Sequence, residues 1–346
     1  MSDPFAALSA DARGRLREHA VPAWVPPMLA TLTGERFSDP AWIYERKFDG
    51  ERCLAYRDGG AVRLLSRNRK TLNATYPEVA DALDAERPRR FILDGEIVAM
   101  EAGETSFERL QQRMQITDAD AARRSGVAVR YYVFDVLHLE GCDTTRLALL
   151  DRKRLLGTAF AFRDPVHLAE HRDGDGVAFY EEACRRGWEG LIAKRGDAPY
   201  EGRRSPDWLK FKCVNQQELV VGGWTDPAGS RAELGALLVG YYEDGALVYA
   251  GKVGTGYDAR TLRALGERLR RIERRASPFA RGAPPARGAH WVTPELVVEV
   301  GFSEWTRAGR LRHPRYVGLR TDKAAREVVR ERPTRPSPGP RGRRGV

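Results

Sequence analysis

The residues of this chain that are best suited to covalent phosphoryl chemistry are lysines and carboxylates placed beside glycines. Lys47 stands two residues before Asp49 in the stretch Lys47-Phe48-Asp49-Gly50. A lysine amine attacks an electrophile only when it is unprotonated, and burial or neighbouring cations lower its pKa toward that state. The same residue types return in Asp94-Gly95-Glu96, in Glu189-Gly190 followed by Lys194, and in Lys210-Phe211-Lys212. Together these motifs predict a lysine nucleophile supported by acids and further lysines.

The later motifs supply what a phosphoryl-transfer site needs around its nucleophile. Glu96 and Glu189 are candidate ligands for a hard cation, which neutralises the charge that develops on phosphate oxygens. Lys210 and Lys212 alternate along a predicted strand and therefore face the same side. Two lysines on one buried face are costly without an anion, so we expect a phosphate group there. We also expect these two lysines and a bound metal ion to lower the pKa of Lys47.

Each of these residues also has a plainer structural explanation. Lys-x-Asp-Gly is a short pattern that an exposed turn between two strands also satisfies. Glu45 fits a solvent-facing carboxylate on a strand, and Phe134 fits a core aromatic on a central strand. Glutamates such as Glu96 are common on protein surfaces. The prediction of a site therefore depends on the whole series of motifs.

Short apolar runs predict the strands on which most of these motifs lie. Arg52–Tyr56 and Val62–Leu65 flank Asp58-Gly59-Gly60, which is typical of a hairpin. Phe91–Leu93 is a buried-strand run, and Tyr131–Leu137 is the strongest strand pattern of the first half. Further strands are predicted at Leu191–Ala193 and Trp208–Phe211, and helices at residues 77–86, 107–114, 147–156 and 178–186. This mixed order predicts an α+β domain with mostly antiparallel sheets.

The pattern becomes strand-rich near Gln216, where we place a domain boundary. The predicted strands are Leu219–Trp224, Gly235–Tyr242, Leu247–Val253 and Leu296–Phe302, with a helix at Asp258–Arg275. Short strands with one interposed helix predict a small OB-type barrel. The expected domains are a lead-in at 1–21, a first domain at 22–215, a barrel at 216–332 and a disordered basic tail at 333–346.

The composition bounds the class of protein. A chain of 346 residues with 42% hydrophobic and 31% charged residues is typical of a soluble protein of two domains. The formal net charge of +10 favours polyanionic partners, although five of the arginines lie between Arg332 and Val346. The chain contains no run of 18 apolar residues and no signal-peptide pattern, so we expect an intracellular protein.

The four cysteines of the chain are widely scattered. They are Cys53, Cys142, Cys184 and Cys213, and no Cys-x-x-Cys pair occurs among them. This spacing argues against a zinc knuckle and against a secreted disulfide scaffold. We therefore expect free and mostly buried thiols.

The series of motifs resembles the covalent nucleotidyltransferase superfamily of ATP-dependent DNA ligases, RNA ligases and mRNA capping enzymes. The likeness is greatest to bacterial ligases of the ligase D and ligase C type, with matching pieces from about Pro22 to Arg330. The resemblance implies an α+β fold: a nucleotidyltransferase (ATP-grasp-like ligase) adenylation domain with mostly antiparallel sheets, followed by a C-terminal OB-fold barrel.

The resemblance also assigns roles around the nucleotide. It makes Lys47 the group that attacks the α-phosphate of ATP, expels pyrophosphate and holds AMP as a phosphoramidate. Glu45 would accept a hydrogen bond from the adenine amino group. Phe134 would stack on adenine, and Ile192 would pack on the opposite face of the base. Arg52 and Arg67 match arginines that contact the ribose and the phosphate side of the site, where an arginine fork binds oxygen pairs.

Further roles concern the phosphates and the metal ion. By resemblance, Glu96 binds the ribose or a metal ion, Glu189 is a second metal ligand, and Lys194, Lys210 and Lys212 lie near phosphates. Arg320, Asp322 and Lys323 match an Arg-x-Asp-Lys element that closes over ATP and orients pyrophosphate. Many relatives have glycine where Arg69 stands, so the loop after Arg67 is expected to differ.

The sequence thus predicts an ATP-dependent DNA ligase that seals nicks with 3′-hydroxyl and 5′-phosphate ends, in DNA repair or end joining. The expected cofactors are ATP and Mg²⁺ or Mn²⁺, and the expected partners are nicked double-stranded DNA and a Ku-like end-binding protein. We expect a monomer in the cytoplasm, associated with the nucleoid, with a hinge between Cys213 and Gln217. The alternatives are an RNA ligase, a GTP-using capping-type enzyme and a non-catalytic DNA-binding module.

Overall fold

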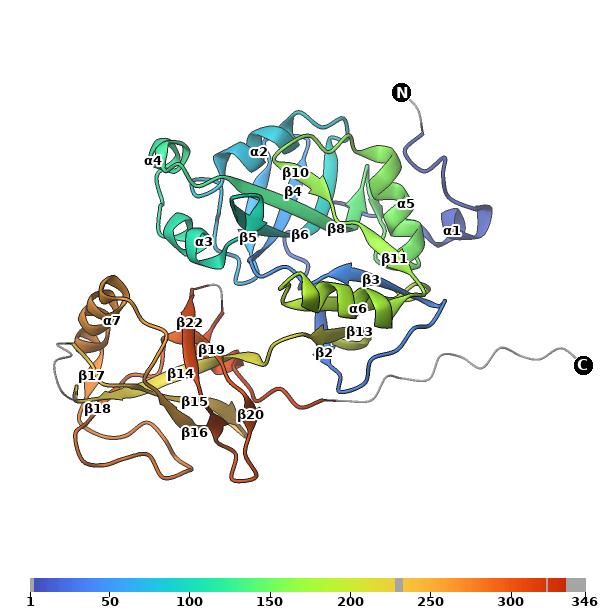
Figure 1. Ribbon diagram of the computed structural model, residues 1–346. Coiled ribbons are helices and arrows are strands. Elements are labelled where there is room, and N and C mark those ends of the chain that lie inside the picture. Colours follow the sequence, from blue (N-terminus) through green and yellow to red (C-terminus); the bar gives the residue numbers. More distant parts are fainter. Residues whose placement is uncertain (1–2, 228–232, 322, 334–346) are drawn as a thin grey trace, which may run out of the picture. The chain divides into compact units, whose positions relative to one another are not determined.

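The computed structural model describes residues 3–227, 233–321 and 323–333, and the chain divides into two compact units (Figure 1). The first unit contains the chain up to Cys213, and the second runs from Val214 to Glu331. This division lies two residues before the boundary that the sequence predicts at Gln216. Apart from Pro333, the predicted basic tail lies outside the described residues. No helix in the described part of the chain is long and apolar enough to cross a membrane.

The first unit contains an eight-stranded sheet with the order β1-β9-β8-β6-β4-β5, to which β10 adds beside β8 and β7 beside β6. Its ladders are antiparallel except that between β10 and β8. Apolar side chains of α2, α3 and α5 join those of β4, β6 and β8 in one core. The strands are β1 (Arg17–Glu18), β4 (Glu51–Asp58), β5 (Arg63–Ser66), β6 (Arg90–Glu101), β7 (Glu104–Thr105), β8 (Val129–Leu139), β9 (Cys142–Asp143) and β10 (Val166–Leu168). The helices are α1 (Ala10–Arg15), α2 (Pro77–Asp84), α3 (Phe107–Met114), α4 (Ala119–Arg124) and α5 (Leu149–Ala159).

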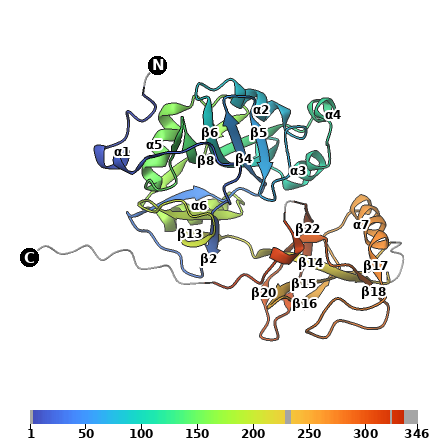
Figure 2. The ribbon, with the colours of Figure 1, turned by 180° about the vertical axis from the view of Figure 1, so that it is seen from behind.

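A second sheet of the first unit has five strands in the order β11-β3-β12-β13-β2, antiparallel except between β13 and β2. Helix α6 packs against it, as both ribbon views show, and buries side chains such as Tyr44 and Phe211 (Figures 1 and 2). On its other face, Trp208 shares an apolar cluster with Leu54 and Phe134 of the first sheet. The elements are β2 (Leu29–Leu32), β3 (Trp42–Arg46), β11 (His171–Asp173), α6 (Gly176–Arg185), β12 (Gly190–Arg195) and β13 (Arg204–Lys212). The two sheets therefore face each other across a shared apolar layer.

Strand β6 contains both apolar runs that flank Asp94-Gly95-Glu96, namely Phe91–Leu93 and Ile97–Met100. The motif lies inside this twelve-residue strand, which continues through Ile97 to Met100 as the sequence predicts. Strand β4 pairs with β6 on one edge and with β5 on the other, which gives the predicted hairpin. Gly59 in the hairpin turn has φ +74°, a conformation that glycine adopts without steric cost.

The second unit is built around the long strand β14, which pairs with β15 on one edge and with β19 and β18 on the other. Its side chains contribute to a separate core. The predicted helix is present as α7, which begins after Asp258, whose carboxylate accepts the N–H of Thr261 at 2.6 Å. The elements are β14 (Gln216–Thr225), β15 (Leu237–Glu243), β16 (Ala246–Val253), α7 (Ala259–Arg271), β17 (Glu273–Arg274), β18 (Ala289–Val292), β19 (Val297–Gly301), β20 (Glu304–Trp305), β21 (Leu311–Arg312), β22 (Arg315–Arg320) and the 3-10 helix η1 (Ala325–Glu327).

Two of the four cysteines form a disulfide, so the prediction of free thiols throughout is wrong. Cys184 near the end of α6 is bonded to Cys213 at the end of the first unit, with their Cα atoms 5.3 Å apart. The pairing is invisible in the sequence because the two cysteines are 29 residues apart and only the packing of α6 brings them together. Cys53 and Cys142 are free, as expected.

Candidate active site

Five of the predicted site residues lie on one face of the five-stranded sheet. Ile192 of β12 lies opposite Glu45 of β3 on one side and Lys210 of β13 on the other. Because side chains alternate along a strand, Lys194 and Lys212 point to the same face. The intervening residues of these strands form the apolar core beneath α6. The polar face turns toward the first sheet, which carries Arg52, Glu96 and Phe134.

Lys47 follows β3 directly, at one end of this face. Its backbone N–H donates to the carbonyl of Gly190 at 2.9 Å. Its Nζ forms an ion pair with the carboxylate of Glu189, and about 20% of its side chain is exposed. The predicted nucleophile and one predicted metal-binding acid are therefore in direct contact.

Acidic side chains control the protonation of Lys47. Burial acts to lower the pKa of Lys47, but Glu189, Asp49 and Glu96 outweigh it and hold the pKa above its ordinary value. The lysines of the chain therefore do not lower this pKa as predicted, and the predicted effect of a bound metal ion stays a prediction. Strand β12 separates β3 from β13, and the groups that act on Lys47 are carboxylates.

Two glycines allow these acids to approach Lys47. A Cβ on Gly50 would collide with the carbonyl of Ile97 and with the side chain of Glu96, so the turn after Lys47 lies directly against β6. Gly190 has φ +146°, and a Cβ there would collide with the carbonyl of Phe211. Glycine therefore follows Asp49 and Glu189 because a larger side chain would not fit at either position.

Glu45 is buried between two lysines, one of which the sequence analysis missed. Its Oε2 accepts a hydrogen bond from Lys194 Nζ at 2.6 Å, and its Oε1 lies 2.7 Å from Lys153 Nζ. Burial opposes the charge on Glu45, but the two lysines prevail and its pKa is lowered. Burial and the charge of Lys153 lower the pKa of Lys194 to about 8, against the effect of Glu45.

Lys153 escaped prediction because it lies in a run of charged residues, Asp151-Arg152-Lys153-Arg154, that resembles an exposed helix face. The helical spacing does contain a signal. Leu149, Arg152, Lys153 and Leu156 follow the i, i+3, i+4, i+7 pattern of one face, and all four are buried. Arg152 forms a fully buried pair with Asp135, at 2.7 and 2.9 Å.

Arg52 on β4 is held by a carboxylate of its own sheet. Its Nε and Nη2 donate to the two oxygens of Asp94 at 2.5 and 2.6 Å, and the hydroxyl of Tyr200 donates to Asp94 at 2.6 Å. Burial acts against the charge of Arg52, but Asp94 raises its pKa above the ordinary value. Asp94 therefore orients the guanidinium of Arg52, the group that the family resemblance assigns to ribose or phosphate oxygens.

Phe134 lies in the apolar layer between the two sheets, and only 7% of it is exposed. The Nζ of Lys194 is 4.2 Å from its ring centroid, and the guanidinium of Arg52 is 4.6 Å from it. The ring of Trp208 meets it edge to face at 6.0 Å. The ring thus links the lysine that holds Glu45 to the arginine that is held by Asp94, and cations over a ring face are attracted to it.

Arg67 and Glu96 come from the first sheet. Glu96 lies opposite Arg52 in the ladder between β4 and β6, and its charge acts on Lys47. Arg67 follows β5 in a tight turn in which Ser66 N–H donates to the carbonyl of Lys70 at 2.8 Å. Arg69 in this turn has φ +64°, a left-handed conformation that glycine adopts without steric cost.

The chain matches two family models. One, described as the ATP dependent DNA ligase domain, matches residues 27–212, and the other, described as the ATP dependent DNA ligase C terminal region, matches residues 230–323. This chain belongs to the family of ATP-dependent DNA ligases. The predicted membership of the ligase family is confirmed.

Individual relatives of this ligase carry the name LigD. The multifunctional non-homologous end joining protein LigD of Pseudomonas aeruginosa is 39% identical over 327 residues, which is 92% of this chain and 38% of that protein. The multifunctional non-homologous end joining DNA repair protein LigD of Mycobacterium tuberculosis is 40% identical over 313 residues, which is 88% of this chain and 40% of that protein. The chain thus spans about two fifths of the length of these curated relatives.

A solved structure supports the fold. The structure described as mycobacterial DNA ligase D complexed with ATP and MES shares 38% sequence identity and a TM-score of 0.62, and the match covers 89% of this chain and 98% of that one. The predicted class, a nucleotidyltransferase adenylation domain with a C-terminal OB-fold, is confirmed.

The Arg-x-Asp-Lys element of this ligase lies in the second unit. Arg320 ends β22, opposite Val297 of β19. The Nζ of Lys323, whose side chain is 10% exposed, forms an ion pair with Glu218 of β14. Asp322 lies outside the described residues. Glu218 is therefore a partner of the element that sequence reasoning did not identify.

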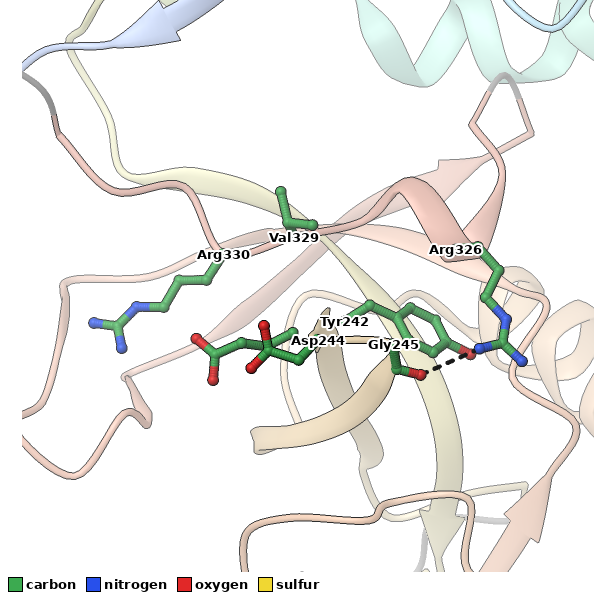
Figure 3. A pocket seen from close by; sticks show the side chains of 7 residues that line it. Tyr242, Asp244, Gly245, Arg326, Val329 and Arg330 are labelled. Atoms are coloured by element: carbon green, nitrogen blue, oxygen red, sulfur yellow. Dashed lines mark hydrogen bonds between the residues drawn. The ribbon is translucent and has the colours of Figure 1, made fainter.

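The second unit also has a cavity of about 340 Å³ that contains none of the predicted site residues (Figure 3). Arg326 stands over the ring of Tyr242 at 4.7 Å and donates to the carbonyl of Gly245 at 3.4 Å. Glu243, Asp244, Val329 and Arg330 complete the lining. Acidic and basic groups are mixed here, so the lining favours neither an anion nor a cation.

The acids near Lys47 fit a metal ion that is completed by substrate oxygens. In the described part of the chain, no group of three or more His, Cys, Asp or Glu side chains is placed to hold a metal by itself. Magnesium commonly takes one or two carboxylates and completes its shell with phosphates and water. Glu96 and Glu189 are hard oxygen donors of this kind, and the charges of both act on Lys47.

Proposed function

We propose that this ligase seals nicks in double-stranded DNA that carry a 3′-hydroxyl and a 5′-phosphate, through a lysyl-AMP intermediate and a DNA-adenylate. The observation that carries the proposal is the position of Lys47, in contact with Glu189 at one end of the face that bears Lys194, Lys210 and Lys212. A nucleophile beside acids and a row of cations matches the needs of nucleotidyl transfer from ATP.

In the first step, the neutral amine of Lys47 attacks the α-phosphorus of ATP, so that a P–N bond forms and the bond to pyrophosphate breaks. Before this, Nζ must lose the proton that Glu189 helps it to hold. In the second step, an oxygen of the DNA 5′-phosphate attacks the AMP phosphorus, and the P–N bond breaks. In the third, the 3′-hydroxyl attacks the 5′-phosphorus and AMP leaves.

The residues of the same sheet face would bind the nucleotide. Glu45, fixed by Lys153 and Lys194, faces the adenine amino group, and Phe134 and Ile192 pack against the base. Lys210 and Lys212 contact phosphates, and Arg52 and Arg67 contact the ribose and phosphate side. From the second unit, Arg320, Asp322 and Lys323 orient pyrophosphate. A carboxylate that faces position 6 of the base accepts from the amino group of adenine and repels the carbonyl oxygen of guanine, which favours adenine.

A divalent cation, Mg²⁺ or Mn²⁺, held by Glu96 and Glu189 would neutralise the charge that builds on the phosphate oxygens. The remaining work of the protein is positioning. Asp94 orients Arg52, and Glu189 orients Lys47.

The biological setting is a further proposal. The LigD relatives are named for non-homologous end joining, so we infer a role in DNA repair, with nicked or broken DNA as substrate and a Ku-like end-binding protein as partner. The enzyme would act in the cytoplasm at the nucleoid, as a monomer. The surplus of basic residues supports binding to backbone phosphates without sequence preference.

The test is intact mass after incubation with ATP and magnesium, with GTP and NAD in parallel, using protein stripped of any bound AMP. We expect one added AMP from ATP alone, and no adduct in Lys47→Ala. Sealing of a labelled DNA nick, compared with an RNA nick, then identifies the substrate.

The other outcomes separate the alternatives. An adduct from GTP would point to a capping-type enzyme. Preference for the RNA nick would point to an RNA ligase. A wild-type protein without any adduct would contradict the covalent mechanism and leave a DNA-binding module.

A further inference from the structure

The disulfide lies at the point where the first unit passes into the second. Cys213 is the last residue of the first unit, and Cys184 is in the last turn of α6. Both cysteines are partly exposed, so a small reagent can reach them. The bond closes a loop that contains Glu189, which makes the ion pair with Lys47.

The connection between the units is short because both of its sides are anchored. On one side, Cys213 donates its N–H to the carbonyl of Glu189 at 2.9 Å, in addition to the disulfide. On the other side, Asn215 accepts the N–H of Phe302 at 2.9 Å, and its side chain donates to the carbonyl of Ser303 at 2.6 Å. Val214, 40% exposed, is the residue between the two anchors.

From this arrangement we infer that Cys184 and Cys213 form a thiol–disulfide exchange site that sets the freedom of the connection between the two units. A dithiol reductant attacks one sulfur, passes through a mixed disulfide and leaves oxidised, while both cysteines become thiols. Two electrons and two protons thus move from the reductant to the cysteine pair. Oxidation by a disulfide reagent reverses the exchange.

Reduction would loosen the connection without unfolding the first unit. The carbonyl of Lys212 also accepts hydrogen bonds from Tyr180 at 3.0 Å and from Arg36 at 3.3 Å, and these contacts do not depend on the disulfide. The end of β13 therefore stays in place while Cys213 keeps only its backbone bond to Glu189. The oxidised form restricts the movement of Cys213, from which the connection starts, and the reduced form permits it.

The consequence for activity rests on the proposed function. In the proposed function the second unit orients pyrophosphate in the first step, and pyrophosphate leaves before the DNA steps, so a restricted connection would slow the passage from one step to the next. DNA is handled in a reducing compartment, where disulfides that persist are commonly catalytic or redox-sensing. The reduced form would be the faster ligase.

The first experiment counts thiols in full-length protein. Alkylation under denaturing, non-reducing conditions, followed by intact mass, should label Cys53 and Cys142, and labelling after reduction should reach all four cysteines. Peptide mapping should recover Cys184 joined to Cys213. Labelling of all four cysteines in air-oxidised protein would overturn the inference.

The second experiment compares oxidised and reduced protein by hydrogen exchange. We expect faster exchange after reduction in the peptide that contains Cys213 and Val214, and unchanged exchange in β4. Cys213→Ser should exchange like the reduced form in both conditions, whereas Cys142→Ser should still respond. This readout does not use ATP or DNA, so it stands even if the proposed function fails.

The third experiment measures nick sealing in a single turnover. Oxidised wild type should seal about 5-fold or more slowly than reduced wild type, as expected for coupling of a local switch to a distant step. Cys184→Ser and Cys213→Ser should both seal at the reduced rate with and without reductant. Equal rates in oxidised and reduced wild type would refute the effect on activity, whatever the exchange data show.

Discussion

Lys47 and Lys194 lie on the same face of the five-stranded sheet, yet the structure moves their pKa values in opposite directions. The end at Lys47 combines one lysine with Glu189, Asp49 and Glu96, and the pKa of Lys47 is raised. The end at Lys194 combines two lysines with the carboxylate of Glu45 and the charge of Asp135, and burial with the charge of Lys153 lowers the pKa of Lys194 to about 8.

The contrast arises over a short distance in the sequence, from Glu45 on β3 to Lys47 just after it. It shows that burial alone does not decide the state of a lysine, because both side chains are largely withdrawn from water. The ratio of acids to bases around each ammonium decides it. The acidic end favours the protonated form of Lys47, and the basic end favours the charged form of Glu45.

The largest expected change comes from removing the acid that holds Lys47. Glu189→Gln should slow formation of the AMP adduct by about 100-fold, as for loss of one preorganised charged group. The neutral amine is the attacking form, so the rate rises with pH toward the pKa of Lys47. Without the Glu189 charge this pKa falls, and the rising limb should shift to lower pH. Stopped-flow adenylation from pH 6 to pH 10 measures both effects.

Glu182→Gln is the matched control, because Glu182 on α6 pairs with Arg172 and Arg186 away from the site. It should leave the rate and the pH profile unchanged. A Glu189→Gln enzyme whose rising limb does not move would contradict the assignment of Glu189 as the group that holds the proton.

A smaller effect is expected at the basic end. Lys153→Met leaves the buried Glu45 with one lysine, and removal of one partner from a buried pair costs about 3 to 5 kcal/mol of unfolding free energy. ATP binding should weaken about 10-fold, or about 1.4 kcal/mol, because Glu45 loses its fixed position. Urea unfolding and ATP calorimetry measure these changes.

Two variants sharpen this test. Lys153→Arg retains the positive charge and should recover most of the ATP affinity. Lys252→Met, at an exposed position of the second unit, should change neither quantity. Normal ATP affinity in a folded Lys153→Met protein would exclude a positioning role for Lys153.

The smallest effect is a pH dependence of stability with opposite signs for the two lysines. The pKa of Lys194 is about 8 in the folded protein, below its ordinary value of 10.5, so the unfolded chain binds more protons between these values. The contribution of Lys194 to stability therefore rises with pH from about 8 to 10.5. The folded pKa of Lys47 is raised, so its contribution is complete below 10.5 and is lost at higher pH.

Chemical unfolding of wild type, Lys194→Met and Lys47→Met at pH 7 to 10.5 measures this difference. The difference in unfolding free energy between wild type and Lys194→Met should rise with pH. The difference between wild type and Lys47→Met should stay constant over the same range. A constant difference for Lys194→Met would mean that Glu45 fully offsets the effect of burial on the pKa of Lys194.

The sequence supports a good part of this fold because the relevant elements are local. The alternation around Asp58-Gly59-Gly60 predicts the hairpin of β4 and β5. The apolar run Tyr131–Leu137 predicts β8, and helix α3 has the predicted bounds. The resemblance to ligases places Glu189 in the same site as Lys47, as a metal ligand, but the ion pair between the two residues appears only in the structure. These signals need only short-range periodicity or a short motif.

What the sequence does not predict depends on contacts between distant segments. Lys153 acts on Glu45 only because α5 packs under β8 and places its charged face inward. The Cys184–Cys213 bond requires α6 and the end of β13 to lie side by side. The pKa of Lys47 depends on strand order, which sets β12 between β3 and β13. The spacing of α5 indicates that Lys153 is buried, but no local pattern names the partner of any of these contacts.

The alternation of β13 has a consequence for the lengths that related chains can tolerate. Lys210 and Lys212 share one side of the strand, and Leu209 and Phe211 share the other. Deletion of one residue inside the ladder would exchange the two sets, placing lysines beneath α6 and apolar side chains in the site. Insertions and deletions in relatives should therefore avoid the ladder and gather in connections such as residues 196–203, whereas single replacements can accumulate on either side independently.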